Sequence, residues 1–212
     1  MAFTLAQYAA LRPFLYHVTA RENLARLQRT RRIEAASAIL RVAGREDLLR
    51  ARRPEPLRVT VAGDSIVLKD QHPLVAANVT LVSGWDFADF VEYLNDHVYF
   101  WPGDAIGMVG PGGRLLAHYA PESPLVLRVP FAALVAANSD LPPLFSPYNS
   151  GAPRMQRGKG VQRGPDLFRP AERFQRRPHE VVEVAFRGSV VLPSDTAVAG
   201  EQDRWVSLGA SM

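Results

Sequence analysis

Residues 14–27 read FLYHVTARENLARL, and this stretch decides how the chain begins to fold. Its first half, FLYHV, is an apolar run that predicts a β-strand. The segment ARENLARLQRTRR (20–32) follows at once and predicts a helix, with Leu24 and Leu27 on one face. His17 therefore stands at the end of a strand, where the chain turns into a helix.

The residues at this junction allow more than one role. Thr19, followed three residues later by Glu22, has the form of a capping box, which explains the threonine by helix initiation alone. His17 fits either a core histidine bonded to a neighbouring carbonyl or a ligand-binding group at the strand end. The other histidines lack metal-ligand spacings such as H-x-x-x-H, so no metal site is predicted.

The composition is that of an ordinary globular chain. Of 212 residues, 47% are apolar and 22% charged, which predicts a single domain over 1–212. The absence of cysteine excludes disulfides, cysteine zinc sites and a cysteine nucleophile. No long uncharged apolar run or signal pattern is present, so we expect a cytoplasmic protein without a membrane partner. The net charge of +4 is compatible with a polyanionic partner.

Helical and strand patterns alternate irregularly along the rest of the chain. The predicted helices cover 4–13, 45–54, 86–96 and 131–138, and the predicted strands cover 97–101, 124–129 and 180–192. Residues 57–71 predict a hairpin around a Gly-Asp turn, and GPGG (110–113) predicts a turn. Because no regular βαβ order emerges, these patterns indicate an α+β fold.

Residues 139–178 depart from this pattern, because they are dense in proline and glycine and lack strand alternation. From Arg154 to Arg177 the segment holds seven arginines and Lys159 against two acidic residues. So long a loop is either a solvated excursion or a functional element, here a basic substrate loop. Its aromatic residues, which could stack on bases, are Phe145, Tyr148, Phe168 and Phe174.

Three segments, in the same order, resemble the DarT-type ADP-ribosyltransferases. LYHVTARENLARLQRTRRI (15–33) resembles the first strand and helix of that family. LNDHVYFWPGD (94–104) resembles its second element and VVEVAFRGSVV (181–191) its third. The resemblance spans most of the chain from 15 to 191. It implies an ADP-ribosyltransferase fold with a split central β-sheet flanked by helices, and NAD as co-substrate without a metal.

The resemblance also implies roles for individual residues. His17 would hydrogen-bond the nicotinamide-side ribose, with Thr19 nearby, and Tyr99 or Phe100 would stack on nicotinamide. A glutamate would bind the ribose 2′-hydroxyl, near the charge of an oxocarbenium-like transition state. The expected catalytic residues are Glu183, His17 and Tyr99. The expected NAD-binding residues are Tyr16, His17, Val18, Thr19, Asn23, Tyr99, Phe100 and Arg154.

Two assignments remain open within the resemblance. Glu180 and Glu183 lie three apart on a predicted strand, so they face opposite sides and only one can enter the cleft. Counting back from RGSVV selects Glu183, with Glu180 as the alternative. The family also has an arginine between the first helix and the Tyr-Phe strand, for which the candidates here are Arg45, Arg50, Arg52 and Arg53. Gly103 and Asp104 stand where the family has an arginine and a serine, which indicates a divergent branch.

The function implied is transfer of ADP-ribose from NAD to a base of DNA or RNA, as in a toxin or phage-defence enzyme. The acceptor-binding residues expected in the loop are Arg163, Arg169, Arg173 and Arg176. An antitoxin or an ADP-ribose-removing hydrolase would be the neutralising partner. Transfer to a protein or small molecule, NAD hydrolysis, and a non-catalytic nucleic-acid-binding module are the alternatives.

Overall fold

The computed structural model describes residues 2–72, 74–153, 155–156, 159–199 and 204–210. The α-helices are α1 (Leu5–Leu11), α2 (Leu24–Thr30), α3 (Ala36–Val42), α4 (Phe87–Asn95), α5 (Pro111–Tyr119) and α6 (Phe131–Ala137). The 3-10 helices are η1 (Arg21–Asn23), η2 (Glu46–Leu48), η3 (Ala76–Asn78), η4 (Ala120–Glu122), η5 (Pro165–Leu167), η6 (Ala171–Arg173) and η7 (Pro178–Glu180).

The first strands are β1 (Phe14–Thr19), β2 (Arg32–Glu34), β3 (Leu57–Val61), β4 (Asp64–Leu68), β5 (Thr80–Leu81), β6 (His97–Gly103), β7 (Leu125–Pro130) and β8 (Leu144–Ser146). The remaining strands are β9 (Met155–Gln156), β10 (Lys159–Gly160), β11 (Gln162–Arg163), β12 (Arg169–Pro170), β13 (Glu183–Arg187), β14 (Ser189–Val191), β15 (Ala197–Ala199) and β16 (Trp205–Ser207).

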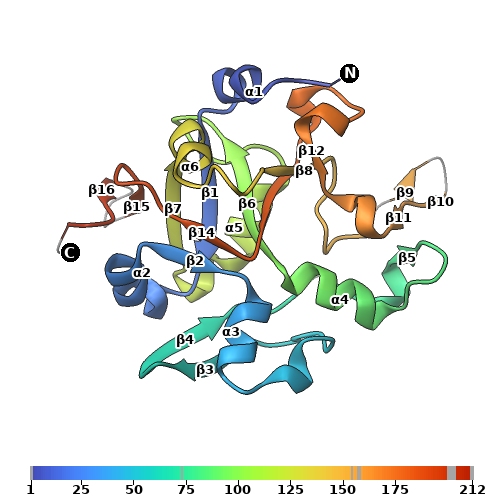
Figure 1. Ribbon diagram of the computed structural model, residues 1–212, viewed down its shortest axis with the longest axis horizontal. Helices are drawn as coiled ribbons and strands as arrows, with labels where there is room; N and C mark the ends of the chain where they lie inside the picture. Colours follow the sequence, from blue (N-terminus) through green and yellow to red (C-terminus); the bar gives the residue numbers. More distant parts are fainter. Residues whose placement is uncertain (1, 73, 154, 157–158, 200–203, 211–212) are drawn as a thin grey trace.

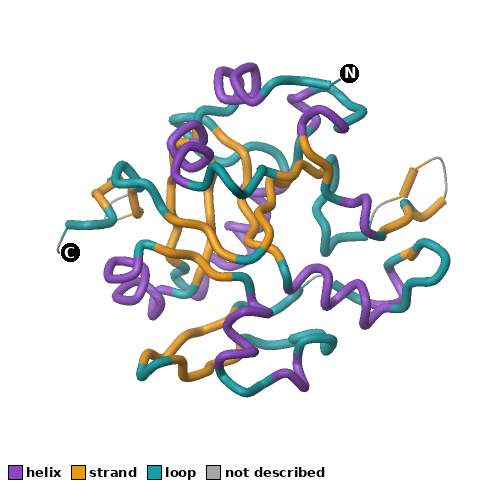
Figure 2. Tube along the Cα trace, viewed as in Figure 1, coloured by secondary structure: helices purple, strands orange, loops and turns teal. Residues whose placement is uncertain are grey.

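A large antiparallel sheet forms the centre of the molecule, in the order β12-β8-β13-β6-β1-β7-β15-β16. Helices lie around this sheet, and the β3–β4 hairpin with α3 lies at the end of the molecule opposite α1 (Figures 1 and 2). This arrangement confirms the α+β class and the expectation of a large sheet flanked by helices. In the described part of the chain no helix has the length and apolar character needed to cross a bilayer.

Strand β6 divides the central sheet into two parts. Its residues 101–103 pair with β1, where the last ladder pair is Tyr16 with Trp101. Its residues 97–100 pair instead with β13, from Val184 opposite Phe100 to Arg187 opposite His97. Beyond Tyr16 the ladder between β1 and β6 is therefore open, while β1 continues to pair with β7 as far as Thr19.

The elements with strong local signals form as predicted. The helix expected over 86–96 is α4, whose N-cap Asp86 exchanges side-chain bonds with Asp89 in a capping box. The hairpin expected over 57–71 is β3–β4, but its turn is Ala62-Gly63, one residue earlier than the Gly-Asp predicted. Both turn residues have positive φ (50° and 86°), as a two-residue hairpin turn of this twist requires.

Several predicted boundaries were wrong. The helix expected over 20–32 is η1 followed by α2, which ends where Arg31 takes a left-handed conformation (φ 51°). Of the helix expected over 45–54, η2 alone forms. GPGG does not make a turn but begins α5. A Cβ added to Gly112 would lie 2.9 Å from Trp101 Cβ, so glycine lets α5 approach β6 closely.

The segment 139–178 is not a single solvated excursion. Its strands β8 and β12 join the central sheet beside β13. Phe145, Phe168 and Phe174 are at most 4% exposed and belong to the hydrophobic cores. The prediction that these rings stack on bases is therefore corrected, because burial of apolar area holds them inside the domain.

Candidate functional site

A cleft of about 280 Å³ opens where β1 separates from β6. Its opposite wall is formed by the end of β4 and the residues that follow it, from Ile66 to His72. The sequence-predicted residues that line it are His17, Val18, Thr19, Asn23, Tyr99 and Glu183. Because the ladder is open there, side chains from both faces of the sheet reach the cleft: His17 from the face of Phe100, and Glu183 from the face of Tyr99.

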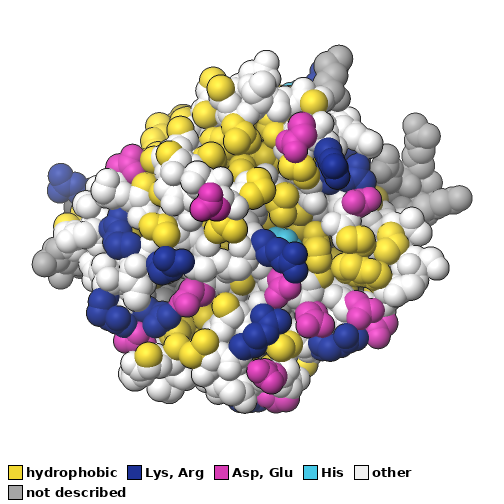
Figure 3. All heavy atoms as spheres, viewed as in Figure 1, with side chains coloured by type: hydrophobic (Ala, Val, Ile, Leu, Met, Phe, Trp, Pro, Cys, Tyr) yellow, Lys and Arg dark blue, Asp and Glu magenta, His cyan; other side chains and the backbone are white. Residues whose placement is uncertain are grey.

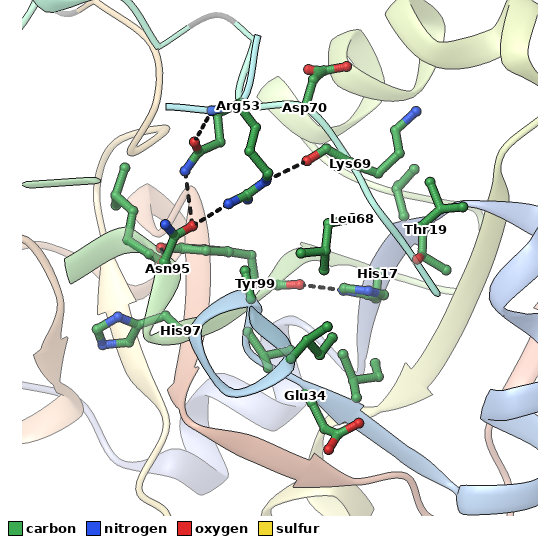
Figure 4. A pocket seen from close by; sticks show the side chains of 18 of the residues that line it. His17, Thr19, Glu34, Arg53, Leu68, Lys69, Asp70, Asn95, His97 and Tyr99 are labelled. Atoms are coloured by element: carbon green, nitrogen blue, oxygen red, sulfur yellow. Dashed lines mark hydrogen bonds between the residues drawn. The ribbon is translucent and has the colours of Figure 1, made fainter. Parts of the chain in front are cut away.

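His17 occupies the opening itself. Its Nδ1 lies 2.8 Å from the carbonyl oxygen of Tyr99, and so bridges the two strands where their ladder ends (Figure 4). Burial lowers the pKa of His17, while the bond to that carbonyl opposes the shift. The neutral ring must donate from Nδ1, since a carbonyl can only accept, and its Nε2 is then a hydrogen-bond acceptor.

Thr19 and Glu22 do not form the capping box predicted. The N-cap of η1 is Ala20, and no side chain caps it. Instead the Asn23 amide donates to Thr19 Oγ1 and to the Val67 carbonyl, both at 2.9 Å, and accepts from the Val67 N–H at 2.9 Å. Asn23 thus pairs with the backbone N–H and carbonyl of Val67 as a neighbouring strand would, and it links the β3–β4 hairpin to Thr19 of β1. These bonds give Asn23 a structural role, while its role in NAD binding stays a prediction.

Of the aromatic residues predicted to bind NAD, Tyr99 alone lines the cleft. Its hydroxyl donates to the Leu94 carbonyl (2.7 Å), and burial beside Glu183 holds its pKa well above the usual range. Phe100 is fully buried in the main core. Tyr16 is 1% exposed on the other face of the sheet, where its hydroxyl donates to the Asp104 carbonyl. The assignments of Phe100 and Tyr16 to the cleft are therefore wrong.

Glu183 begins β13 opposite Ser146 and is 2% exposed. Its Oε2 accepts a hydrogen bond from the Ser150 N–H at 2.9 Å. Burial raises the pKa of Glu183 to about 7, against the lowering effects of Ser150 and of the Arg163 charge.

Glu180 lies outside the cleft. The strand expected from residue 180 begins only at 183, so Glu180 is the last residue of η7 and its carboxylate accepts from the Arg177 N–H (2.9 Å). The expected alternation of Glu180 and Glu183 across one strand is wrong, because Glu180 belongs to η7 and β13 begins only at Glu183. The structure still brings Glu183, rather than Glu180, to His17 and Tyr99.

Among the four candidate arginines, the structure brings Arg53 to the cleft. Its side chain is 9% exposed, and its guanidinium donates to Asn95 Oδ1 (2.8 Å) and to the Lys69 carbonyl (3.3 Å), as Figure 4 shows. Burial lowers its pKa to about 10. These hydrogen-bond partners are neutral, and the attraction of Asp70, which also lines the cleft, opposes the lowering of the pKa.

No sequence signal distinguishes Arg53 from its neighbours. Arg45 pairs with Asp47 at the surface, and Arg50 pairs with acidic side chains of α4 and its N-cap. Arg52 stands next to Arg53 in the chain but does not line the cleft. Which arginine lines the cleft depends on the path of the chain after β4, where the Lys69 carbonyl accepts a hydrogen bond from Arg53.

The arginines of the segment 139–178 lie in different surroundings. Arg163 is 2% exposed, so its predicted role as an acceptor-binding residue on the surface is corrected. Arg169 bonds the Asp166 carbonyl, Arg176 bonds the Tyr148 hydroxyl, and Arg173 is exposed. Arg154, expected to bind NAD, lies outside the described residues. On the face drawn in Figure 3, basic and acidic side chains are interspersed.

The fold and the cleft together define an α+β domain with a mainly apolar, ligand-sized site, which carries several polar side chains, at the opening of its central antiparallel sheet. Among the described residues, no cluster of three or more His, Asp or Glu could hold a metal ion. The chain belongs to a family of unknown function, DUF7002, which it matches over residues 13–197. The match runs from the start of β1 to β15 and so includes the residues that line the cleft. No curated protein and no solved structure matches the chain.

Proposed function

We propose that this protein is an NAD-dependent mono-ADP-ribosyltransferase. One observation carries the proposal: His17, Tyr99 and Glu183 come from three adjacent strands, β1, β6 and β13, and line one cleft. These are the residues that the resemblance to DarT-type enzymes selects from segments as far apart as 15–33 and 181–191. The opening between β1 and β6 supports the proposal further, since a split sheet is what that resemblance implies.

The chemistry of the cleft suits this reaction. Breaking the bond between nicotinamide and ribose develops positive charge on the ribose, which a nearby carboxylate stabilises. Glu183 supplies that carboxylate, and the acceptor nitrogen of His17 can receive a bond from a ribose hydroxyl. Arg53, whose hydrogen-bond partners are neutral, supplies a positive charge for a phosphate of the dinucleotide.

The environment of Glu183 also suits proton transfer. A general base works best when its pKa lies near the working pH, and burial raises the pKa of Glu183 to about 7. Glu183 would therefore bind the ribose in its ionised form and accept a proton from the attacking group. Transfer should accordingly increase as the pH rises through about 7.

The proposed acceptor is a base of DNA or RNA. The resemblance supports this choice, as do Arg169, Arg173 and Arg176, which are at least partly exposed on the segment that leads to β13. Arg163 is buried and does not add to this surface. A toxin of this kind requires a neutralising antitoxin or a hydrolase that removes ADP-ribose, and such a partner belongs to the same proposal.

The test is transfer of label from NAD that carries a radioactive adenylate phosphate. The protein is incubated separately with single-stranded DNA, RNA and a protein mixture, and free ADP-ribose is measured in parallel. Glu183→Gln is the inactive variant, and Glu180→Gln is its matched control. Labelled nucleic acid supports the full proposal, while labelled protein or free ADP-ribose alone would change the acceptor. Absence of both NAD binding and NAD turnover would refute the proposal.

A further inference from the structure

The carboxylate of Glu183 is held by a short turn, residues 148–152, that follows β8. Asn149 shapes this turn: its Oδ1 accepts from the Gly151 N–H (3.1 Å) and its carbonyl accepts from the Ala152 N–H (3.3 Å). The turn presents the Ser150 N–H to Glu183 Oε2 at 2.9 Å. The position and the ionisation of the carboxylate therefore depend on how firmly this turn is held.

Arg163 is one of the side chains that hold it, besides Ser146 and Arg176, which bond Tyr148. The Arg163 guanidinium donates to the Ala152 carbonyl (3.1 Å) and, more weakly, to the Asn149 carbonyl (3.5 Å), so it contacts both ends of the turn. Its Cζ also lies 4.8 Å from the centre of the Tyr148 ring. Both hydrogen bonds come from Nη2, and the planar guanidinium lies near the Tyr148 ring at the same time, a combination that the compact lysine ammonium does not reproduce.

The backbone of Arg163 is itself fixed by a distant part of the chain. Strand β11 pairs in parallel with β5, and the Arg163 carbonyl accepts from the Val82 N–H at 2.9 Å. The next residue, Gly164, lies so close to Val82 that an added Cβ would be 2.5 Å from its Cγ2. Arg163 therefore projects beneath the turn from a rigid base, although much of the surrounding segment is rich in proline and glycine.

We infer that Arg163 is a positioning residue, which holds the 148–152 turn under the Glu183 carboxylate and brings a positive charge to that turn. The effect of Arg163 on the carboxylate does not depend on the proposed function. Only the consequence of that effect for catalysis rests on the proposed function. This role replaces the surface role that the arginine-rich sequence suggested for Arg163.

The other groups near the carboxylate do not supply this charge. Tyr99 faces Glu183 from β6 and is neutral, because its pKa is well above the usual range. His17 lines the cleft from β1 and is neutral, because burial lowers its pKa. Ser150 contributes a hydrogen bond without charge. Loss of the Arg163 charge should consequently raise the pKa of Glu183, since that charge lowers it in the intact protein.

The experiment follows the ionisation of Glu183 directly, by 13C NMR of the full-length protein labelled at glutamate Cδ. Glu183→Gln identifies the Glu183 signal by its loss. Arg163→Met removes the charge but retains much of the length of the buried side chain, and Arg163→Lys retains the charge without the planar guanidinium. Arg187→Gln is the matched control, since it removes an exposed arginine from the far end of β13.

The Glu183 titration midpoint should rise most in Arg163→Met, less in Arg163→Lys, and not at all in Arg187→Gln. Amide exchange at Ser150 should be faster in both Arg163 variants, because the turn loses its support. A folded Arg163→Met protein with the parent midpoint and the parent exchange rate would overturn the inference. If Arg163→Met does not fold, Arg163→Lys decides by the same two measurements. Neither depends on NAD, so failure here is distinguishable from failure of the proposed function.

Discussion

Replacing Glu183 with glutamine should stabilise the protein increasingly as the pH rises. Burial raises the pKa of Glu183 from an ordinary 4.5 to about 7, so folding disfavours the ionised carboxylate. Below about pH 4.5 the group is protonated in both states and costs nothing. Between about pH 4.5 and 7 the unfolded chain loses this proton first, and the free energy of unfolding falls. Above about pH 7 the loss is complete.

The size of the effect follows from this pKa difference. Roughly 2.5 units at about 1.4 kcal/mol per unit give about 3.5 kcal/mol. Most of it develops between pH 5 and pH 8, where the change should be about 2–3 kcal/mol. Glutamine is neutral at every pH and can still accept a hydrogen bond from the Ser150 N–H through Oε1. The free energy of unfolding of Glu183→Gln should therefore not fall in this way as the pH rises. Under the proposed function, the same variant should lack transfer activity.

The assay is urea denaturation at several pH values from 5 to 8, followed by tryptophan fluorescence. The difference in unfolding free energy between Glu183→Gln and the parent should grow with pH. Glu180→Gln is the control and should run parallel to the parent, since Glu180 is half-exposed in η7. A difference that stays constant from pH 5 to 8 would refute the reasoning, because it would mean that the buried carboxyl ionises as readily in the folded as in the unfolded protein.

The other predictions concern the cleft and its surroundings. His17→Ala should weaken NAD binding by on the order of 1 kcal/mol, about fivefold in Kd by calorimetry, and unchanged affinity would return His17 to a core role. Asn23→Ala should cost about 1–3 kcal/mol in urea denaturation, because it leaves buried backbone groups of β4 without partners; a neutral result would contradict its structural role. Replacing Arg169, Arg173 and Arg176 together with glutamine should weaken single-stranded DNA or RNA binding. The slope of log affinity against log salt should then fall by about 0.7 for each phosphate that these arginines neutralise, and an unchanged slope would remove them from the acceptor site.

Local sequence patterns predicted the elements whose signals lie within one segment. Residues 86–96 carry both an apolar helical face and Asp86 with Asp89 as caps, and they form α4. The β-branched runs of 57–71 form the β3–β4 hairpin. These elements are set by interactions between residues near each other in the chain, so a short window holds most of the information.

The candidate site was predictable in part, by resemblance rather than by chemistry alone. His17, Tyr99 and Glu183 were selected from three separated motifs, and the structure brings them to one cleft. Tyr16 and Phe100 were selected from the same motifs but do not line the cleft, because Tyr16 packs beside Trp101 and Phe100 lies in the main core. Which side chains border the cleft depends on where β1 and β6 separate.

The sequence by itself determined the α+β class, the helices with their own caps, the hairpin, and the strand that ends near His17. Only the tertiary structure decided that Arg53 reaches the cleft, that Asn23 serves β4, and that Arg163 lies inside the domain. Each of these depends on a partner distant in sequence, as Val67 lies 44 residues from Asn23. A buried polar group must find a hydrogen-bond partner wherever the fold supplies one, and no local pattern records which partner that will be.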